Sequence, residues 1–174
     1  MKLILLAGRI GSGKDTVADH LVERGAVKIA LADKLKIVTQ KLINIFYNEN
    51  IPLTDFYDRE AKERDRGGYT IRHLLQQVGS EVFRETLHEN IWCETLNIPD
   101  AAVVIITDCR RQNEIDYFKK RYPDVVSIRL VRSTCIISTH QSEAYIDELN
   151  TDYVIYNNDT KEELYKKIKF LYPA

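Results

Sequence analysis

The stretch Gly8-Arg9-Ile10-Gly11-Ser12-Gly13-Lys14-Asp15-Thr16 directly follows the apolar run Leu3-Ile4-Leu5-Leu6-Ala7. An apolar run, a glycine-rich turn and then the helical spacing of Val17, Ala18, Leu21 and Val22 predict a strand, a loop and a helix. Glycines let the backbone curl around phosphate oxygens, the N–H groups at the start of the helix point at the anion, and Lys14 reaches the β- and γ-phosphates. The stretch therefore predicts a phosphate-binding loop and a nucleotide site.

The candidate phosphate ligands of this loop are Gly11, Ser12, Gly13 and Lys14. Asp15 stands where a serine or threonine hydroxyl usually contacts Mg²⁺, and the hydroxyl follows one residue later, at Thr16. By this spacing we expect Thr16 to meet the α-phosphate. The spacing is equally compatible with Asp15 binding the metal directly and with Asp15 binding it through a water molecule.

Five strand candidates alternate with helical segments beyond the loop. They are Lys2–Ala7, Val27–Leu31, Ala102–Thr107, Val125–Val131 and Tyr153–Tyr156. Such alternation predicts a three-layer α/β fold, a five-stranded parallel sheet with helices on both faces. Leu3–Leu6 and Val103–Ile106 are continuously apolar, as is typical of central strands buried on both faces, so we expect them to lie side by side.

Residues 32–99, between the second and third strand candidates, form a mostly helical insertion. Its apolar positions at helical spacing, which we expect in the core, are Leu35, Val38, Leu42 and Ile45, and then Ile71, Leu74, Leu75, Val78 and Val82. Asn48–Tyr69 contains Pro52, Gly67, Gly68 and the charge run Asp58–Arg66, which predicts a mobile or solvated excursion. Near the C-terminus, Thr160 and Glu163 form a capping-box pattern before a final amphipathic helix.

Two later strands are followed by candidate catalytic side chains. Asp108 follows the third strand, where an enzyme with a phosphate loop keeps the carboxylate that organises Mg²⁺, and it is also placed to cap the helix beginning near Arg110. Arg132 opens a polar segment, residues 132–150, whose lack of an apolar stripe predicts a lid that closes over substrate and excludes water. His140 in this lid is either solvated or a nucleotide contact.

Composition limits the class of protein. The chain of 174 residues has a formal net charge of −1 and 44% hydrophobic residues, which predicts a single domain over residues 1–174 and gives no sign of non-specific binding to nucleic acid or membrane. Cys93, Cys109 and Cys135 lack CxxC spacing, so reduced thiols fit better than disulfides or zinc. No apolar stretch approaches transmembrane length, and the N-terminus does not resemble a secretory signal. We therefore expect a soluble, cytoplasmic protein.

Four segments together resemble the bacteriophage-type deoxynucleoside monophosphate kinases. They are Lys2–Asp19, Ile71–Arg84 with Trp92 shortly after, Asp108–Glu114 and His140–Glu143. They occur in family order, so the resemblance extends over nearly the whole chain. The block Arg72-His73-Leu74-Leu75-Gln76, with the glycine, acid and tryptophan that follow it, is more specific than the phosphate loop.

The resemblance implies that the γ-phosphate of ATP is transferred to a deoxynucleoside 5′-monophosphate (dNMP), giving ADP and a deoxynucleoside diphosphate, with Mg²⁺ required. It implies the P-loop kinase fold of the nucleoside monophosphate kinases, with a helical substrate-binding region and a lid. Members of this family are often dimers, so a homodimer is one expectation for this chain.

The resemblance also implies site residues by matching position. Those that would line the monophosphate pocket are Asp33, Lys36, Arg72, Gln76 and Arg84. Arg72 and Arg84 would hold the phosphate, Arg132 would belong to the lid, and Asn158 would lie near the adenine of ATP. Asp33 and Lys36 have an alternative interpretation as the N-cap and the solvent face of their helix.

Other functions would use the same loop. A different small-molecule kinase, such as a dephospho-coenzyme A kinase-like enzyme, would share the loop and lid but differ in its acceptor pocket, and Arg72–Arg84 favours a nucleotide acceptor. A GTP-dependent switch normally carries an Asn-Lys-x-Asp motif, which this sequence lacks, and Arg111 stands where a glycine would follow Asp108. In a non-catalytic nucleotide sensor the arginine-rich lid would have no role in phosphoryl transfer.

Overall fold

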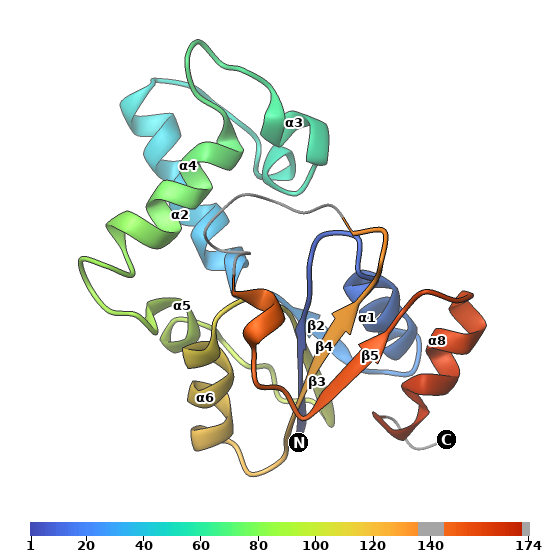
Figure 1. The fold of residues 1–174 in the computed structure, drawn as a ribbon. Coiled ribbons are helices and arrows are strands. Elements are labelled where there is room, and N and C mark those ends of the chain that lie inside the picture. Colours follow the sequence, from blue (N-terminus) through green and yellow to red (C-terminus); the bar gives the residue numbers. More distant parts are fainter. Residues whose placement is uncertain (136–144, 172–174) are drawn as a thin grey trace. The chain divides into compact units, whose positions relative to one another are not determined.

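A parallel sheet with the strand order β2-β3-β1-β4-β5 is the centre of the first of two compact units in the computed structural model, which describes residues 1–135 and 145–171 (Figure 1). This unit comprises Met1–Leu31 and Asn97–Ala174, and the second is Ala32–Leu96. The strands are β1 Lys2–Ala7, β2 Val27–Ile29, β3 Val103–Cys109, β4 Val125–Val131 and β5 Tyr153–Tyr156. The predicted five-stranded parallel sheet is confirmed.

The central strand β1 pairs with β3 on one side and β4 on the other, so its Ile4 lies opposite Ile105 and Val126. Five consecutive side chains of β1 are buried, as both faces of a central parallel strand require. The prediction that the two continuously apolar strands are neighbours is therefore confirmed. β3 runs two residues further than predicted, to Cys109, so Asp108 lies within the strand and not after it.

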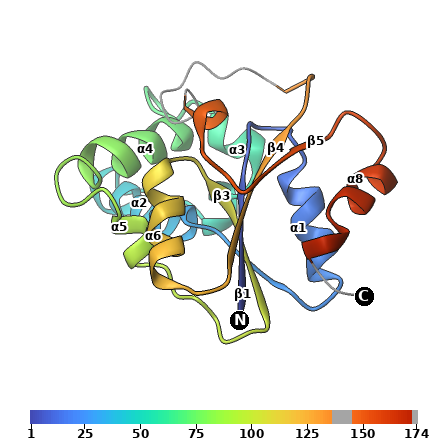
Figure 2. The same cartoon turned by 60° about the horizontal axis from the view of Figure 1, so that its bottom comes forward.

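Helices cover both faces of this sheet (Figure 2). α1 Lys14–Val22 and α8 Lys161–Lys167 lie on one face, and α6 Gln112–Arg121 lies on the other. Val17, Leu21 and Leu164 of the first face pack with sheet residues such as Ile4 in one buried cluster. The Thr160 hydroxyl accepts a hydrogen bond from the Glu163 N–H at 3.3 Å, so the predicted cap of the last helix is present.

The second unit is helical. Its elements are α2 Ala32–Phe46, a 3₁₀ turn Leu53–Phe56, α3 Arg59–Glu63, α4 Ile71–Gln77, a π-helical turn Val78–Val82 and α5 Ile91–Glu94. Ile43, Ile51, Phe56, Tyr69 and Ile71 form its buried cluster. The indole N–H of Trp92 donates to the Gly79 carbonyl at 3.0 Å, which ties α5 to the π-helical turn.

Two expectations for this unit are wrong. The segment Asn48–Tyr69 is not solvated along its whole length. Within it the Phe56 side chain is 0% exposed, and the Arg66 side chain, which is 16% exposed, forms an ion pair with Asp55 at 2.8 Å. The apolar stripe of α2 is also displaced, since Ile45 is 73% exposed and the buried side chains are Thr39 and Ile43.

Candidate active site

The phosphate loop connects β1 to α1 and depends on glycine at two close approaches. Gly8 has φ +145°, and a Cβ there would lie 2.5 Å from the Leu130 carbonyl oxygen. Gly13, the residue before α1, has φ +101°, and a Cβ there would lie 2.3 Å from Nδ2 of Asn157. Gly11, by contrast, has open space around the Cβ position. The loop backbone is thus packed tightly on the sheet side and is open at its middle.

Lys14 folds back across this loop. Its Nζ donates to the carbonyl oxygens of Gly8 at 2.6 Å and Arg9 at 2.8 Å and lies 3.5 Å from Oγ of Ser12. A side chain at the first position of the helix therefore places its ammonium over the loop that precedes the helix. This combination of a cation and a helix start is the arrangement that binds phosphate anions.

The two residues after Lys14 lie in the first turn of α1. Oδ1 of Asp15 accepts from Nζ of Lys28 at 3.0 Å, and Asp19 accepts from the same ammonium at 3.0 Å. Burial lowers the pKa of Lys28, but its hydrogen bonds to these carboxylates outweigh burial and raise the pKa. Asp15 is thus the partner of Lys28, and its metal role stays a prediction, as does the α-phosphate contact of Thr16, which is half-buried.

Asp108 binds the backbone two residues after the end of β2. Its Oδ1 accepts from the Leu31 N–H at 2.7 Å. The alternative that Asp108 caps the following helix is wrong, because α6 begins at Gln112 with Arg111 as its N-cap residue. Glu114 is 1% exposed, and its Oε2 accepts hydrogen bonds from the backbone N–H groups of Arg110 at 2.7 Å and Arg111 at 3.2 Å. Asp108 lies beside the loop, since Cys109 of β3 is in register with Ala7 of β1.

Two consecutive asparagines follow β5 and hold the loop and the start of the predicted lid. Nδ2 of Asn157, a residue 7% exposed, donates to the Ser12 carbonyl at 2.9 Å. Oδ1 of Asn158 accepts from the Ser133 N–H at 2.8 Å. The place of Asn158 near the adenine of ATP stays a prediction. Sequence reasoning missed Asn157, although its place after a parallel strand, at the sheet edge that carries the loop, was a usable signal.

A carboxylate near the end of the predicted lid, Asp147, contacts two arginines near the loop. Oδ2 of Asp147, in the 3₁₀ turn Ile146–Glu148, accepts from Nη2 of Arg9 at 2.7 Å and from its Nε at 3.2 Å. Nη1 of Arg129 lies 3.7 Å from Oδ1. Arg132 is exposed just after β4, whereas His140 lies outside the described residues. Sequence reasoning missed the Asp147 contacts.

The second unit holds the residues predicted to bind the acceptor. Oδ1 of Asp33 accepts from Nζ of Lys36 at 3.1 Å and from the Tyr57 hydroxyl at 3.0 Å. Nζ of Lys36 also lies 3.9 Å from the centroid of the Tyr57 ring. Burial and then the Asp33 carboxylate raise the pKa of Tyr57 to about 12. The N-cap and solvent-face alternative is wrong, because Asp33 lies inside α2 and the Lys36 side chain is only 15% exposed.

The remaining predicted acceptor residues lie on α4 and beyond the π-helical turn. Arg72, in the first turn of α4, forms an ion pair with Glu63 of α3. Gln76 lies half-buried near the end of α4. Nη1 of Arg84 donates to the Glu89 carbonyl at 3.3 Å. The contacts thus join Asp33 to Lys36 and α3 to α4, while the pocket as a whole stays a prediction.

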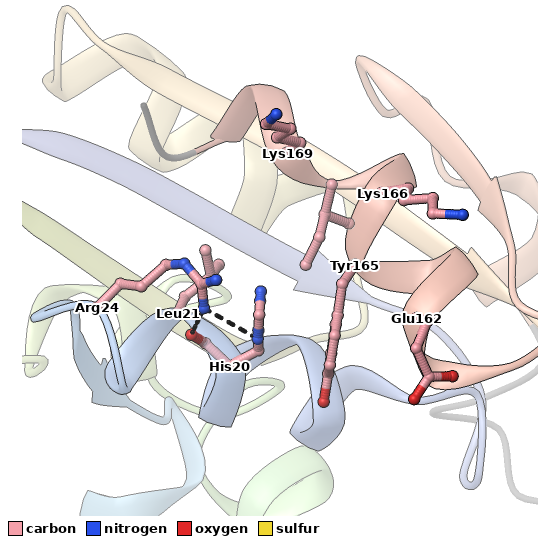
Figure 3. Close-up of a pocket in the computed structure, with 8 residues that line it drawn as sticks. His20, Leu21, Arg24, Glu162, Tyr165, Lys166 and Lys169 are labelled. Carbon is pink, nitrogen blue, oxygen red and sulfur yellow. Dashed lines mark hydrogen bonds between the residues drawn. The ribbon is translucent and has the colours of Figure 1, made fainter. Parts of the chain in front are cut away.

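A separate cavity of about 350 Å³ lies between α1 and α8 (Figure 3). The His20 and Tyr165 rings that line it stack with centroids 3.7 Å apart, and Arg24 donates to Nδ1 of His20 at 3.0 Å. Burial and then the Arg24 charge lower the pKa of His20. The cavity lies toward the C-terminal end of α1, whereas the phosphate loop precedes its N-terminal end. Within residues 1–135 and 145–171, no helix is long and apolar enough to cross a membrane.

A family model and a curated relative agree on one family of proteins. A family model described as deoxynucleotide monophosphate kinase matches residues 59–168. A protein of Acanthamoeba polyphaga mimivirus, named "Putative deoxynucleotide monophosphate kinase", is 34% identical over 188 residues, which cover 97% of this chain and 94% of that protein. A solved structure from Thermus thermophilus shares 18% identity over 98% of this chain and 95% of its own, with a TM-score of 0.49. Shikimate kinase from Aquifex aeolicus shares 16% identity over 97% and 94%, with a TM-score of 0.44.

Proposed function

The chain belongs to the deoxynucleotide monophosphate kinase family, and from this premise we propose how its residues divide the transfer of a phosphoryl group from ATP to a dNMP. The enzyme is an ATP-dependent phosphotransferase whose products are ADP and a deoxynucleoside diphosphate. Such a transfer needs positioning and positive charge around the moving group more than it needs a strong base.

The donor phosphates bind at the loop between β1 and α1. The observation that carries this assignment is the position of Lys14, whose Nζ lies 2.6 and 2.8 Å from two carbonyl oxygens of the loop. An ammonium in that place neutralises charge on the β- and γ-phosphates, and the N–H groups of Gly11, Ser12 and Gly13 bind their oxygens. Thr16 contacts the α-phosphate from the first turn of α1.

The residues beside the loop fit a magnesium ion. Mg²⁺ in phosphoryl-transfer sites is held by one or two carboxylates together with phosphate oxygens and water. Asp108 presents a half-buried carboxylate at the end of β3, next to the loop, and would hold the ion, with Asp15 as a second, outer carboxylate. When bound, the ion would neutralise the negative charge that develops on the β- and γ-phosphates during the transfer.

The acceptor binds in the second unit. Arg72 and Arg84 hold the monophosphate of the dNMP, because guanidinium groups match phosphate oxygens in geometry and charge. Lys36, oriented by Asp33, adds a third positive charge, and Gln76 contributes an amide to the nucleoside. Arg132 at the start of the lid approaches the transferred group when residues 132–150 close over the nucleotides, which excludes water and prevents hydrolysis of ATP.

The function is tested by measuring ADP release from ATP and Mg²⁺ with each common deoxynucleoside and ribonucleoside monophosphate in turn. Lys14→Ala serves as the blank, since it removes the cation of the loop. We expect release that depends on one or more dNMPs and is lost in the variant. Release that no monophosphate stimulates, while ATP still binds, would refute the acceptor assignment. A variant with normal turnover would refute the role of the loop.

A further inference from the structure

Two arginine side chains beside the phosphate loop share the carboxylate of Asp147. Its Oδ2 accepts from Nη2 of Arg9 at 2.7 Å and from Nε of Arg9 at 3.2 Å, and its Oδ1 lies 3.7 Å from Nη1 of Arg129. Arg9 is part of the loop, and its carbonyl oxygen accepts from Nζ of Lys14 at 2.8 Å. Arg129 is in register with Ala7, the residue that precedes the loop. All of these residues belong to the first unit, so the three charged groups lie where the donor phosphates are proposed to bind.

The guanidinium of Arg129 is the less well satisfied of the two. The Arg129 side chain is only 18% exposed, yet its contact with Asp147 is longer than a hydrogen bond, because Arg9 takes the two short contacts of this carboxylate. Within residues 1–135 and 145–171, the Arg129 guanidinium makes no hydrogen bond, and its Nε is buried. A cation that has lost hydration without gaining hydrogen bonds is unfavourable. An anionic oxygen at the loop would accept from Arg129 and offset its charge.

The turn that carries Asp147 is anchored to the first unit. Ile146 and Leu149, on either side of the carboxylate, are both buried. The Asn150 N–H donates to Oε1 of Gln112, the first residue of α6, at 2.9 Å. A carboxylate on such an anchored turn can hold a long side chain in one orientation, which reduces the entropy lost when that side chain binds an anion.

We propose that Asp147 is a positioning residue for ATP, which holds the guanidinium groups of Arg9 and Arg129 beside the loop so that Arg129 donates to a phosphate oxygen. This inference rests on the proposed function, which assigns the donor phosphates to the loop. Asp147 does not touch the nucleotide and acts through the arginines. A carboxylate that merely lay near the phosphates would repel them and weaken ATP binding. The sign of the effect of Asp147 on ATP affinity therefore distinguishes the two roles.

The test compares wild type with Asp147→Asn, Asp147→Glu, Arg129→Gln and the double variant Asp147→Asn/Arg129→Gln. Glu163→Gln is the matched control, because the Glu163 side chain is 47% exposed and pairs with Lys166 at 2.6 Å, while that of Asp147 is 53% exposed. Calorimetric titration with ATP and Mg²⁺, and separately with dAMP, dCMP, dGMP and dTMP, gives the affinity of each protein for donor and acceptor. Thermal unfolding without nucleotide shows whether each variant is folded.

We expect Asp147→Asn and Arg129→Gln each to bind ATP about tenfold more weakly, through the loss of one oriented, charge-assisted contact, and to bind the dNMP as wild type does. Asp147→Glu keeps the carboxylate and should stay within about threefold of wild type for ATP. The double variant should lose clearly less than the product of the two single losses, because Asp147 acts through Arg129.

Several results would overturn the inference. They are unchanged or tighter ATP binding in Asp147→Asn, an equal loss in Glu163→Gln, an equal weakening of ATP and dNMP, and single losses that multiply in the double variant. Should Asp147→Asn not fold, Arg129→Gln still tests the contact, and wild-type ATP affinity in that variant would refute it. Wild-type protein that binds no ATP would instead overturn the proposed function.

Discussion

Replacing Gly13 by alanine should destabilise the phosphate loop by two separable effects. An L-residue at φ +101° costs about 1–2 kcal/mol. The new Cβ would also lie 2.3 Å from Nδ2 of Asn157, so the amide must move and the buried Ser12 carbonyl loses its donor. An unsatisfied buried carbonyl costs about 1–3 kcal/mol. We therefore expect Gly13→Ala to lower the free energy of unfolding by about 2–5 kcal/mol.

Gly11→Ala is the matched control. Gly11 has φ +84° with nothing within 4 Å of its Cβ position, so it carries the backbone cost alone, about 1–2 kcal/mol. Both substitutions remove the same backbone freedom from the unfolded chain, so that contribution cancels between them. The difference between the two variants isolates the contact with Asn157.

Urea unfolding followed by far-ultraviolet circular dichroism measures these free energies. Asn157→Ala alone removes the same hydrogen bond that Gly13→Ala disrupts. The double variant should therefore lose about 1–3 kcal/mol less than the sum of the single variants, because the lost bond is counted once. Equal losses in Gly11→Ala and Gly13→Ala, or additive losses in the double variant, would refute the reasoning.

Three further predictions concern charge. Asp108→Asn removes the carboxylate charge and should lower turnover at least tenfold, but it keeps an acceptor for the Leu31 N–H, so the free energy of unfolding should change by less than about 1 kcal/mol. Asp108→Ala removes the acceptor as well and should also cost about 1–3 kcal/mol of stability. An active Asp108→Asn variant would contradict the magnesium role. Arg84→Ala should raise the KM for the dNMP in steady-state assays and leave that for ATP nearly unchanged, and an equal rise for both would move Arg84 out of the acceptor site. The pKa of His20 is lowered in the folded protein from its ordinary 6.5, so the unfolded chain binds a proton at this histidine at higher pH than the folded protein does. The contribution of His20 to stability should therefore fall as pH drops through 6.5 and stay level above it. Urea midpoints of wild type and His20→Gln, measured from about pH 5.5 to 7.5, test this: the variant should lack this pH dependence, and midpoints that change with pH as in wild type would exclude it.

The parts that follow from sequence are those that local chemistry determines. The loop and its flanking elements were predictable because glycines, an apolar run and helical spacing act over neighbouring residues. The central strands were predictable because burial on both faces leaves a continuous apolar run at Val103–Ile106. The cap at Thr160 follows from a spacing of three residues. Each of these signals lies within one element.

The parts that sequence did not predict depend on contacts between distant elements. Asn157 meets Ser12 across a sequence separation of 145 residues, which no local pattern encodes. Phe56 is buried because Ile43 and Ile71, from two other helices, pack against it, although the charges around it predict solvent exposure. The buried face of α2 was predicted wrongly for the same reason. Helical periodicity allows more than one set of its side chains to be buried, and the helices that pack against α2 determine which set is buried.

The acceptor residues proposed here all fall within one uninterrupted stretch, Ala32–Leu96, which leaves the first unit after Leu31 and returns to it at Asn97. A genetic exchange with two crossover points would replace that stretch whole, and the phosphate loop, Asp108 and residues 132–150 would be inherited unchanged. Substrate range in such a gene can therefore be acquired as a single exchanged segment from a relative.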